Sequence, residues 1–198
     1  MREVLGYSCR MLRSPAPPDG CGTSRRHVLK GLGAVMAAAA VSPARLLAAV
    51  REPRAVSFVH TRTHERLSVT CSADGSYDED SLAALNWFLR DDLTGDQYPM
   101  DPALFDILHD LRAVTEAASP FQVISGYRSP RTNAMLRERS HGVAAGSLHL
   151  QGRAIDVRLG DVASATLRDA AIRLRRGGVG YYAASDFVHI DTGRVRYW

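Results

Sequence analysis

The sequence predicts a single α+β domain in which a central, mainly antiparallel sheet is flanked by helices. About 149 of the 198 residues remain after an N-terminal export segment, and that length suits one domain with one core. The chain contains no internal repeat and no linker that would divide this part. Helical patterns come first and strand patterns cluster late, which favours α+β over an alternating α/β fold.

The first half of the domain is expected to start with a hairpin. Its expected elements are strands at 57–59 and 67–71, helices over 81–89 and 101–118, and a strand at 121–124. The first helix begins near Asp78 or Asp80, and a loop at 93–100 separates it from the second. Asp101 followed by Pro102 is a typical helix start, with an Asp cap and Pro in the first turn.

The second half is expected to supply most of the sheet. Its expected elements are a helix over 130–139, a strand at 154–159, a helix from Asp161 to 176, and strands at 179–182 and 187–191. Asp161 is the expected N-terminal cap of the long helix, and Gly177 and Gly178 end it.

Residues 1–49 are predicted to be a twin-arginine signal peptide. Arg25 and Arg26 precede a weakly hydrophobic run of Gly and Ala. That run is shorter than the about 20 apolar residues that a spanning helix needs, and Ala48 and Ala49 fit a cleavage site. We therefore expect export by the twin-arginine translocase to the periplasm or cell envelope, with no stable membrane span after cleavage. The alternative is an uncleaved, basic membrane anchor.

Charge and cysteine content narrow the function of the remaining chain. Seven of the 25 basic residues but only two of the 21 acidic ones lie in residues 1–49, which leaves a net charge of −1. Nothing in that balance favours nucleic acid as a partner. Cys71 is the one cysteine left after residue 49, so neither an intrachain disulfide nor a cysteine-based zinc site is available. Any metal must be held by His and carboxylate groups.

The segment around His149 offers the first two metal-binding groups. Gly152 allows a sharp turn into the strand at 154–159, and this turn would bring Asp156 beside His149. A carboxylate inside an apolar strand needs a partner, and Zn²⁺ would supply it. The alternative is an Asp on the solvent-facing side of a half-exposed strand.

A second imidazole, His189, lies in the apolar run at 187–191. Two His and one Asp can hold Zn²⁺ and leave a fourth position open, which is typical of a hydrolytic rather than a structural site. The alternative is a core histidine, or a surface pair with Asp191. Asp191 could orient the imidazole of His189. Asp186 lies three residues before His189, where the strand should begin.

Arg128, after the strand at 121–124, is a candidate for substrate binding. It could hold a carboxylate or an oxyanion, or it could lie on an exposed turn.

Taken together, these segments resemble a known family. Three motifs occur in the order seen in the zinc D-Ala-D-Ala peptidase and hedgehog-like superfamily: Ser125-Gly126-Tyr127-Arg128-Ser129, Ser147-x-His149-x-x-Gly152-x-Ala154-x-Asp156, and Asp186-x-x-His189. The runs at 178–182 and 189–198 are similar to the C-terminal signature of its murein endopeptidase K branch. The resemblance extends from about Ser57 to Trp198 and implies that superfamily's fold.

The resemblance also implies a role for each site residue. It gives the metal-ligand positions to His149, Asp156 and His189, and it makes Arg128 the arginine that binds and polarises the substrate. The superfamily often has a Glu general base three residues before the last ligand, where this chain has the shorter Asp186. We therefore expect Asp186 to be the general base and Asp191 to support the ligand. Asp191 is the competing candidate for the base.

The function implied for residues 50–198 is that of a zinc metallopeptidase. Its expected substrate is an amide in the peptide cross-links of peptidoglycan, either between D-Ala and a diamino acid or between two diamino acids. One alternative is a D,D- or L,D-carboxypeptidase or dipeptidase acting on small wall peptides. Another is a zinc-containing wall-binding domain without catalytic activity.

Overall fold

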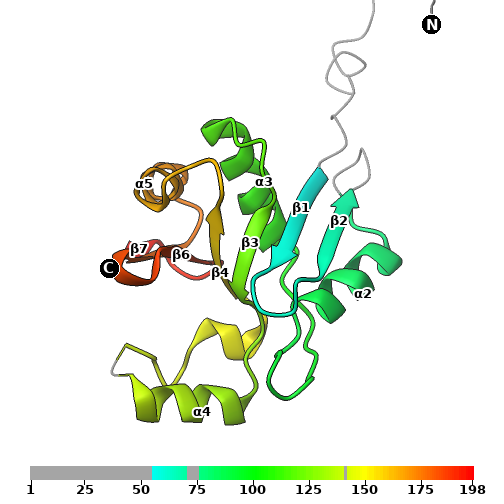
Figure 1. The fold of residues 1–198 in the computed structure, drawn as a ribbon, viewed down its shortest axis with the longest axis vertical. Helices are drawn as coiled ribbons and strands as arrows, with labels where there is room; N and C mark the ends of the chain where they lie inside the picture. The colour runs from blue at the N-terminus through cyan, green and yellow to red at the C-terminus, as the bar shows by residue number, and fades with distance from the viewer. Residues whose placement is uncertain (1–54, 71–75, 141) are drawn as a thin grey trace, which may run out of the picture. The chain divides into compact units, whose positions relative to one another are not determined.

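A seven-stranded sheet in the order β2-β1-β3-β4-β6-β5-β7 organises residues 55–70, 76–140 and 142–198, the residues that this computed structural model describes (Figure 1). Four of its six neighbouring pairs are antiparallel, and β1–β3 and β5–β7 are parallel. The expected mainly antiparallel α+β fold is therefore confirmed. The strands are β1 (Ala55–His60), β2 (Arg66–Thr70), β3 (Phe121–Ser125), β4 (Ala154–Leu159), β5 (Gly178–Tyr182), β6 (Phe187–Asp191) and β7 (Arg196–Tyr197).

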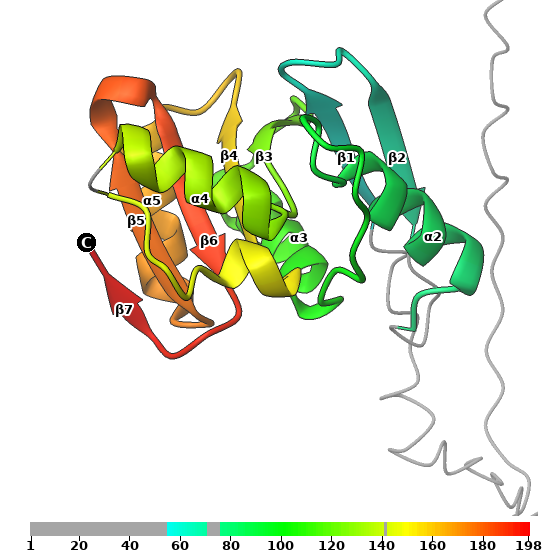
Figure 2. The same cartoon turned by 90° about the horizontal axis from the view of Figure 1, so that it is seen from below.

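Two of the four helices in the described residues pack together on one face of the sheet. They are α3 (Ala103–Thr115), which contacts β1, and α5 (Ser164–Leu174), which contacts β4, β5 and β6. Helix α2 (Glu79–Phe88) lies beside β2, and α4 (Pro130–Arg139) lies apart, beyond the end of β3 (Figures 1 and 2). Two short 3₁₀ turns complete the fold, η1 (Leu148–Gln151) and η2 (Ala183–Ser185).

The strand alternation divides the sheet into an apolar face and a polar face. The residues of β4 and β6 that alternate with Asp156 and His189 point towards α3 and α5 and are buried there. Apolar side chains of β1, β3 and the two helices join them in one core. Its fully buried members include Phe58, Leu104, Phe105, Leu108, Phe121, Ile155, Leu167 and Ile190. This core fixes the strands and leaves the opposite face for polar groups.

Most elements follow the sequence expectation, and the helix ends differ. The helix at 130–139 and the strands at 154–159 and 187–191 are confirmed to the residue. Helix α3 ends at Thr115 and not near 118, because Glu116 adopts a left-handed conformation with φ 53°. Strand β7 was not predicted. The expected signal peptide at 1–49 and Cys71 lie outside the described residues.

Asp161 does not cap α5, contrary to expectation. Its carboxylate accepts hydrogen bonds from the backbone N–H groups of Ala118 and Ser119, at 2.7 and 2.9 Å, and from the Ser119 hydroxyl. These bonds hold the pKa of Asp161 at about 2. Helix α5 begins two residues later, after Ala163. Asp161 therefore fixes the loop before β3 instead.

The turn at Gly152 gives a direct test of local strain. Gly152 has φ +64°, and a Cβ there would overlap the carbonyl oxygen of Pro99. Gly95 has φ +78° with open space around it. We expect Gly152→Ala to lower the free energy of unfolding by about 2–4 kcal/mol, because strain and overlap add. Gly95→Ala should lower it by about 1 kcal/mol from strain alone. Urea unfolding measures both, and equal losses would contradict the close contact at Gly152.

Candidate metal centre

The polar face of the sheet carries one row of functional side chains across three strands, and the row meets a glycine on a fourth. Asp156 on β4 pairs with Ser125 on β3 and with His189 on β6, and His189 pairs with Gly180 on β5. Directly opposed residues of neighbouring strands project to the same face. The pairing of β3 with β4 shifts between Val123 and Ser125, and such an irregularity re-aims the side chains that follow it. Val123 therefore faces the core, whereas Ser125 belongs to the polar row.

His149 reaches this row from outside the sheet. It lies on η1, which begins after Ser147 and ends at Gly152 in the expected left-handed conformation. His149 Nδ1 lies 2.7 Å from the carbonyl oxygen of Gly126, so Nδ1 carries the proton and donates it there. This hydrogen bond leaves the lone pair of Nε2 directed at the sheet.

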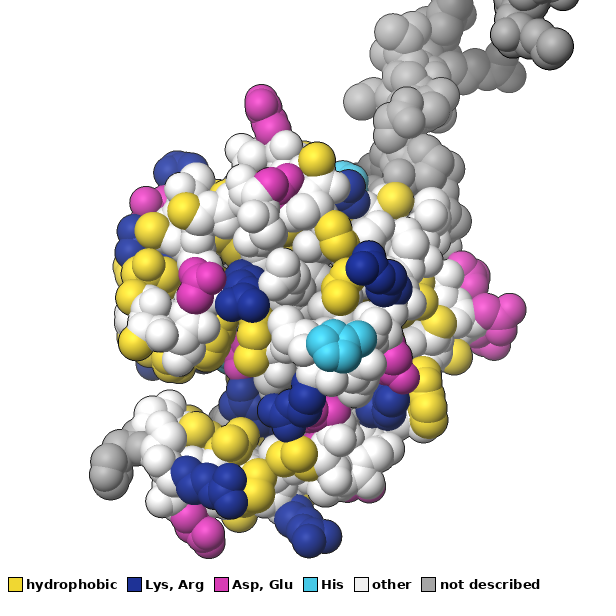
Figure 3. Space-filling view, viewed as in Figure 1, with side chains coloured by type: hydrophobic (Ala, Val, Ile, Leu, Met, Phe, Trp, Pro, Cys, Tyr) yellow, Lys and Arg dark blue, Asp and Glu magenta, His cyan; other side chains and the backbone are white. Residues whose placement is uncertain are grey.

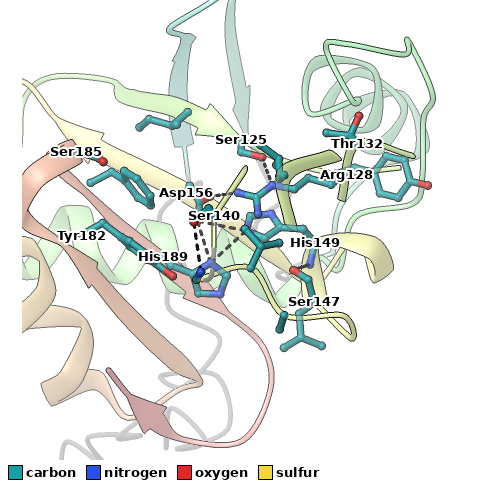
Figure 4. Close-up of a pocket in the computed structure, with 18 of the residues that line it drawn as sticks. Ser125, Arg128, Thr132, Ser140, Ser147, His149, Asp156, Tyr182, Ser185 and His189 are labelled. Carbon is teal, nitrogen blue, oxygen red and sulfur yellow. Dashed lines mark hydrogen bonds and ion pairs between the residues drawn. The ribbon is translucent and has the colours of Figure 1, made fainter. Parts of the chain in front are cut away.

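His149, Asp156 and His189 converge, as Figure 4 shows. His149 Nε2 lies 3.2 Å from Asp156 Oδ1 and 3.1 Å from His189 Nδ1. His189 Nδ1 lies 2.8 Å from Asp156 Oδ1. All three side chains are buried. The structure therefore brings together the three residues that the sequence analysis selected as metal ligands.

This donor set fits a zinc ion. Ligand atoms about 2.0–2.1 Å from a tetrahedral Zn²⁺ lie about 3.3 Å from one another, close to the 2.8–3.2 Å found among the three donor atoms. The second nitrogen of each imidazole is tied to another group, Gly126 for His149 and Asp191 for His189. Such bonds fix the orientation and tautomer of metal-ligating histidines. Two imidazoles and one carboxylate are also ligands that zinc accepts in catalytic sites.

The electrostatics of the cluster also favour a cation at its centre. Burial alone would raise the pKa of Asp156, but the two imidazoles and Arg128 hold it well below its usual value. Burial lowers the pKa of His149, which is therefore neutral at pH 7. Burial opposes protonation of His189 as well, yet its hydrogen bonds to Asp156 and Asp191 raise its pKa to about 9. The carboxylates of Asp156 and Asp191, one on each nitrogen of His189, thus favour positive charge at this point of the cluster.

Arg128 lies against the other oxygen of Asp156. Its Nη2 pairs with Asp156 Oδ2, and its Nε donates to Ser125 Oγ at 2.8 Å. The two oxygens of Asp156 therefore have different partners: Oδ1 faces the imidazoles and Oδ2 faces the guanidinium. The backbone N–H of Ser129, the N-terminal cap of α4, donates to the buried Asp91 at 2.8 Å and fixes the segment that carries Arg128.

Asp191 contacts the nitrogen of His189 that faces away from Asp156. Its Oδ2 lies 3.1 Å from His189 Nε2 and 2.7 Å from Arg196 Nη2. Its Oδ1 accepts from Arg196 Nη1 and from the backbone N–H groups of Gly178 and Gly193. Although burial opposes ionisation, these donors hold the pKa of Asp191 far below its usual value. Asp191 is completely buried and is an anion that orients His189.

Two glycines on β5 make room for this arrangement. A Cβ on Gly178 would overlap the guanidinium of Arg196 and the carboxylate of Asp191, and a Cβ on Gly180 would stand 2.7 Å from the indole of Trp198. Arg196 and Trp198 belong to the segment of β7, which runs beside β5. Alternate glycines thus leave a trough through which both side chains reach the polar row. The sequence placed Arg196 and Trp198 in a run similar to a family signature, but no role at the site was predicted for them. The Gly178-Val179-Gly180 alternation in a strand was the available signal.

Asp186, the expected general base, is not brought to the cluster. It follows η2 in a left-handed conformation with φ 51°. Its carboxylate accepts from Ser164 Oγ at 2.6 Å and lies 3.5 Å from Arg158 Nη1. The left-handed turn directs Asp186 towards the start of α5, whereas its neighbours Ser185 and Phe187 line the cleft. Asp186 is therefore not placed to exchange a proton with a group at His149, Asp156 and His189.

A cleft of about 610 Å³ opens over the cluster. In Figure 3 the surface is hollowed between α4, at the bottom, and the rest of the domain, and basic side chains lie along the hollow. One wall comes from α4 and the segment after it, including Leu136 and Val143, and the other carries Tyr182, Phe187 and Trp198. His149, Asp156 and His189 all line this cleft, so a molecule bound in it could reach the cluster.

Comparison with known proteins decides the family. The family profile described as peptidoglycan L,D-endopeptidase MepK matches residues 48–198. The chain belongs to the MepK family. The peptidoglycan L,D-endopeptidase MepK of Escherichia coli strain K12 is 40% identical over 177 residues, which cover 88% of this chain and 97% of that protein. The probable peptidoglycan L,D-endopeptidase MepK of Haemophilus influenzae is 39% identical over 170 residues, 84% of this chain and 91% of that protein. The resemblance to the MepK branch is thus confirmed.

Proposed function

We propose that this protein is a zinc-dependent endopeptidase that hydrolyses peptide cross-links of peptidoglycan. The observation that carries the proposal is the buried convergence of His149, Asp156 and His189 at the floor of the cleft, in a chain of the MepK family. Relatives named peptidoglycan L,D-endopeptidases, which match along nearly their whole length, support the same reaction.

His149 Nε2, Asp156 Oδ1 and His189 Nδ1 would hold the zinc ion. A zinc ion in such a site supplies Lewis acidity, which polarises an amide carbonyl and makes water acidic near neutral pH. The chain fixes these donors beforehand, because Gly126 holds the ring of His149 and Asp191 holds the ring of His189. Burial of all three excludes bulk water around them and strengthens each electrostatic interaction.

Arg128 would stabilise the negative charge that develops on the carbonyl oxygen of the scissile amide. It lines the cleft and is bound to the Asp156 oxygen that faces away from the imidazoles. The Ser125 hydroxyl holds its Nε, which leaves Nη1 as a donor without a described partner. A guanidinium placed in advance beside a reacting carbonyl is a typical electrostatic stabiliser in amide hydrolysis.

The proposed bond is an L,D cross-link between two diamino acids. In such a link the carboxyl group on the L centre of one diamino acid is joined to the amine on the D centre of the next. A link from D-Ala would instead be a D,D bond. The L,D names of the relatives support the first type. A cleft walled on two sides, which could hold residues on both sides of the amide, supports an endopeptidase over a carboxypeptidase or dipeptidase.

We further propose that the protein works in the periplasm after export through the twin-arginine translocase. The Arg25-Arg26 pair and the mild apolar run after it support this route. Within the described part of the chain, no helix has both the length and the apolar character needed to cross a membrane. Peptidoglycan as the substrate requires a location on that side of the membrane.

Defined muropeptide dimers test the proposed function. We expect the purified zinc-loaded protein to convert a dimer joined between two diamino acids into monomers, and to leave a dimer joined through D-Ala largely intact. Product masses measured by chromatography and mass spectrometry distinguish the two. Preferred cleavage of the D-Ala dimer would overturn the L,D assignment. Binding without cleavage of either dimer would favour the wall-binding alternative.

A further inference from the structure

The indole of Trp198 forms a part of the cleft wall that the mechanism above does not use. Trp198 lines the cleft and is 53% exposed. Its ring lies against Gly180, and its centroid is 5.3 Å from that of His189, with an angle of 49° between the planes. An exposed aromatic ring thus lines the cleft directly beside a proposed zinc ligand.

This indole is held in place although it is half exposed. Its Nε1–H donates to the Tyr182 hydroxyl at 3.1 Å, and the Tyr182 ring stacks on Phe187 at 4.6 Å with an angle of 15° between the rings. Arg196 lies over the Trp198 ring at 4.9 Å. The backbone of Trp198 pairs with Val179 and Tyr181. Because the ring is already fixed in the free protein, binding of a ligand to it costs little side-chain entropy.

The wall around Trp198 is suited to apolar atoms. Arg196 lies over the ring, but both of its terminal nitrogens are bound to the buried Asp191, so its charge is already paired. Tyr182 and Phe187 continue the aromatic surface along the same side. Arg128, which can bind anionic oxygen, projects from the other side of Asp156 (Figure 4).

We propose that Trp198 is the subsite for the hydrocarbon chain of the diamino acid next to the scissile amide. This proposal rests on the cross-link cleavage proposed above. A group that contacts an indole 5.3 Å from the ring of His189 must lie close to the bond that is cut. In a link between two diamino acids, that group is a methylene chain, whereas the glycan is attached further along the stem peptide. Methylene groups pack well on aromatic faces and are removed from water there.

Steady-state kinetics on a sugar-free dimer of diamino-acid-linked peptides test the subsite. We expect Trp198→Ala to raise KM about 5–20-fold with zinc content unchanged, since about 1–2 kcal/mol of packing is lost, and Trp198→Phe to recover part of it. Gly180→Ala keeps Trp198 but displaces its ring, and it should raise KM in the same way. Tyr197→Ala is the matched control, because Tyr197 is 55% exposed on the same strand outside the cleft lining.

A fluorescence measurement gives a readout that does not depend on turnover. The chain has two tryptophans, so Trp87→Phe leaves Trp198 as the one reporter. Trp87 is an exposed residue of α2 outside the cleft lining. We expect mixing of this variant with saturating dimer in a stopped-flow instrument to change the Trp198 emission before product accumulates.

Three results would overturn the subsite while leaving the proposed function intact. The first is wild-type KM in Trp198→Ala on a dimer that the wild type cleaves. The second is unchanged emission of Trp198 at saturating dimer. The third is a KM increase seen with disaccharide-bearing dimers alone, which would assign the ring to the glycan. Absence of cleavage of every dimer by the wild type would instead overturn the proposed function, and with it the subsite.

Discussion

Replacing His149 or His189 by Ala is expected to abolish zinc binding at neutral pH and cross-link cleavage together. Each change removes one of three buried donors that lie 2.8–3.2 Å apart. The free energy of zinc binding to a full set of protein ligands is about 10–16 kcal/mol in structural sites. The loss of one ligand should therefore lower zinc affinity on the order of 10³-fold or more. Metal analysis after dialysis and the rate of dimer cleavage measure the two effects.

His109→Ala is the matched control for these variants. His109 is a partly exposed histidine of α3 that does not line the cleft, and its replacement should leave zinc content and activity unchanged. Full zinc occupancy in His149→Ala or His189→Ala would show that the metal lies elsewhere. Zinc loss with activity retained would show that the reaction does not need it.

Replacing Asp191 by Asn is expected to lower both zinc affinity and stability, whereas replacing Asp186 by Asn should have little effect on cleavage. Asp191 accepts five hydrogen bonds, from Gly178, Gly193, His189 and both terminal nitrogens of Arg196. Asp191→Asn places an NH₂ group against some of these donors, whichever way the amide turns. We expect zinc affinity to fall by about 10–100-fold, and the free energy of unfolding to fall by about 2–4 kcal/mol.

Asp186→Asn should change the cleavage rate by less than about twofold. The side chain of Asp186 is 66% exposed and is engaged by Ser164 and Arg158 rather than by the cluster, and surface substitutions of this kind have small effects. Dimer cleavage, zinc content and urea unfolding should be measured on both variants. A 10²–10⁴-fold loss of rate in Asp186→Asn with zinc retained would restore Asp186 as the general base.

The convergence of His149, Asp156 and His189 could be expected from sequence because local patterns and the family resemblance point to the same residues. Asp156 and His189 are polar residues inside apolar strands, and His149 precedes a glycine that lets the chain turn back. In the structure Asp156 and His189 are direct partners across β4 and β6. The core-facing alternation of the same strands, and the helix at 130–139, also follow from local patterns.

The supporting residues could not be predicted because they depend on pairing between distant segments. Arg196 reaches Asp191 because β7 adds to β5 as a parallel neighbour, and two glycines on β5 leave space for its side chain. No periodicity within residues 194–198 indicates that register. The position of Asp186 could not be predicted for a related reason. Its left-handed backbone conformation turns the carboxylate to Ser164. The spacing between Asp186 and His189 in the sequence does not predict that conformation.

Anomalous X-ray scattering at the zinc edge, from crystals of the zinc-loaded protein, tests the central claim most directly. The account predicts one strong peak at the floor of the cleft, in contact with His149 Nε2, Asp156 Oδ1 and His189 Nδ1. Asp156 Oδ2 should still face Arg128, and His189 Nε2 should still face Asp191. An active protein whose peak lies away from these three atoms would contradict the account.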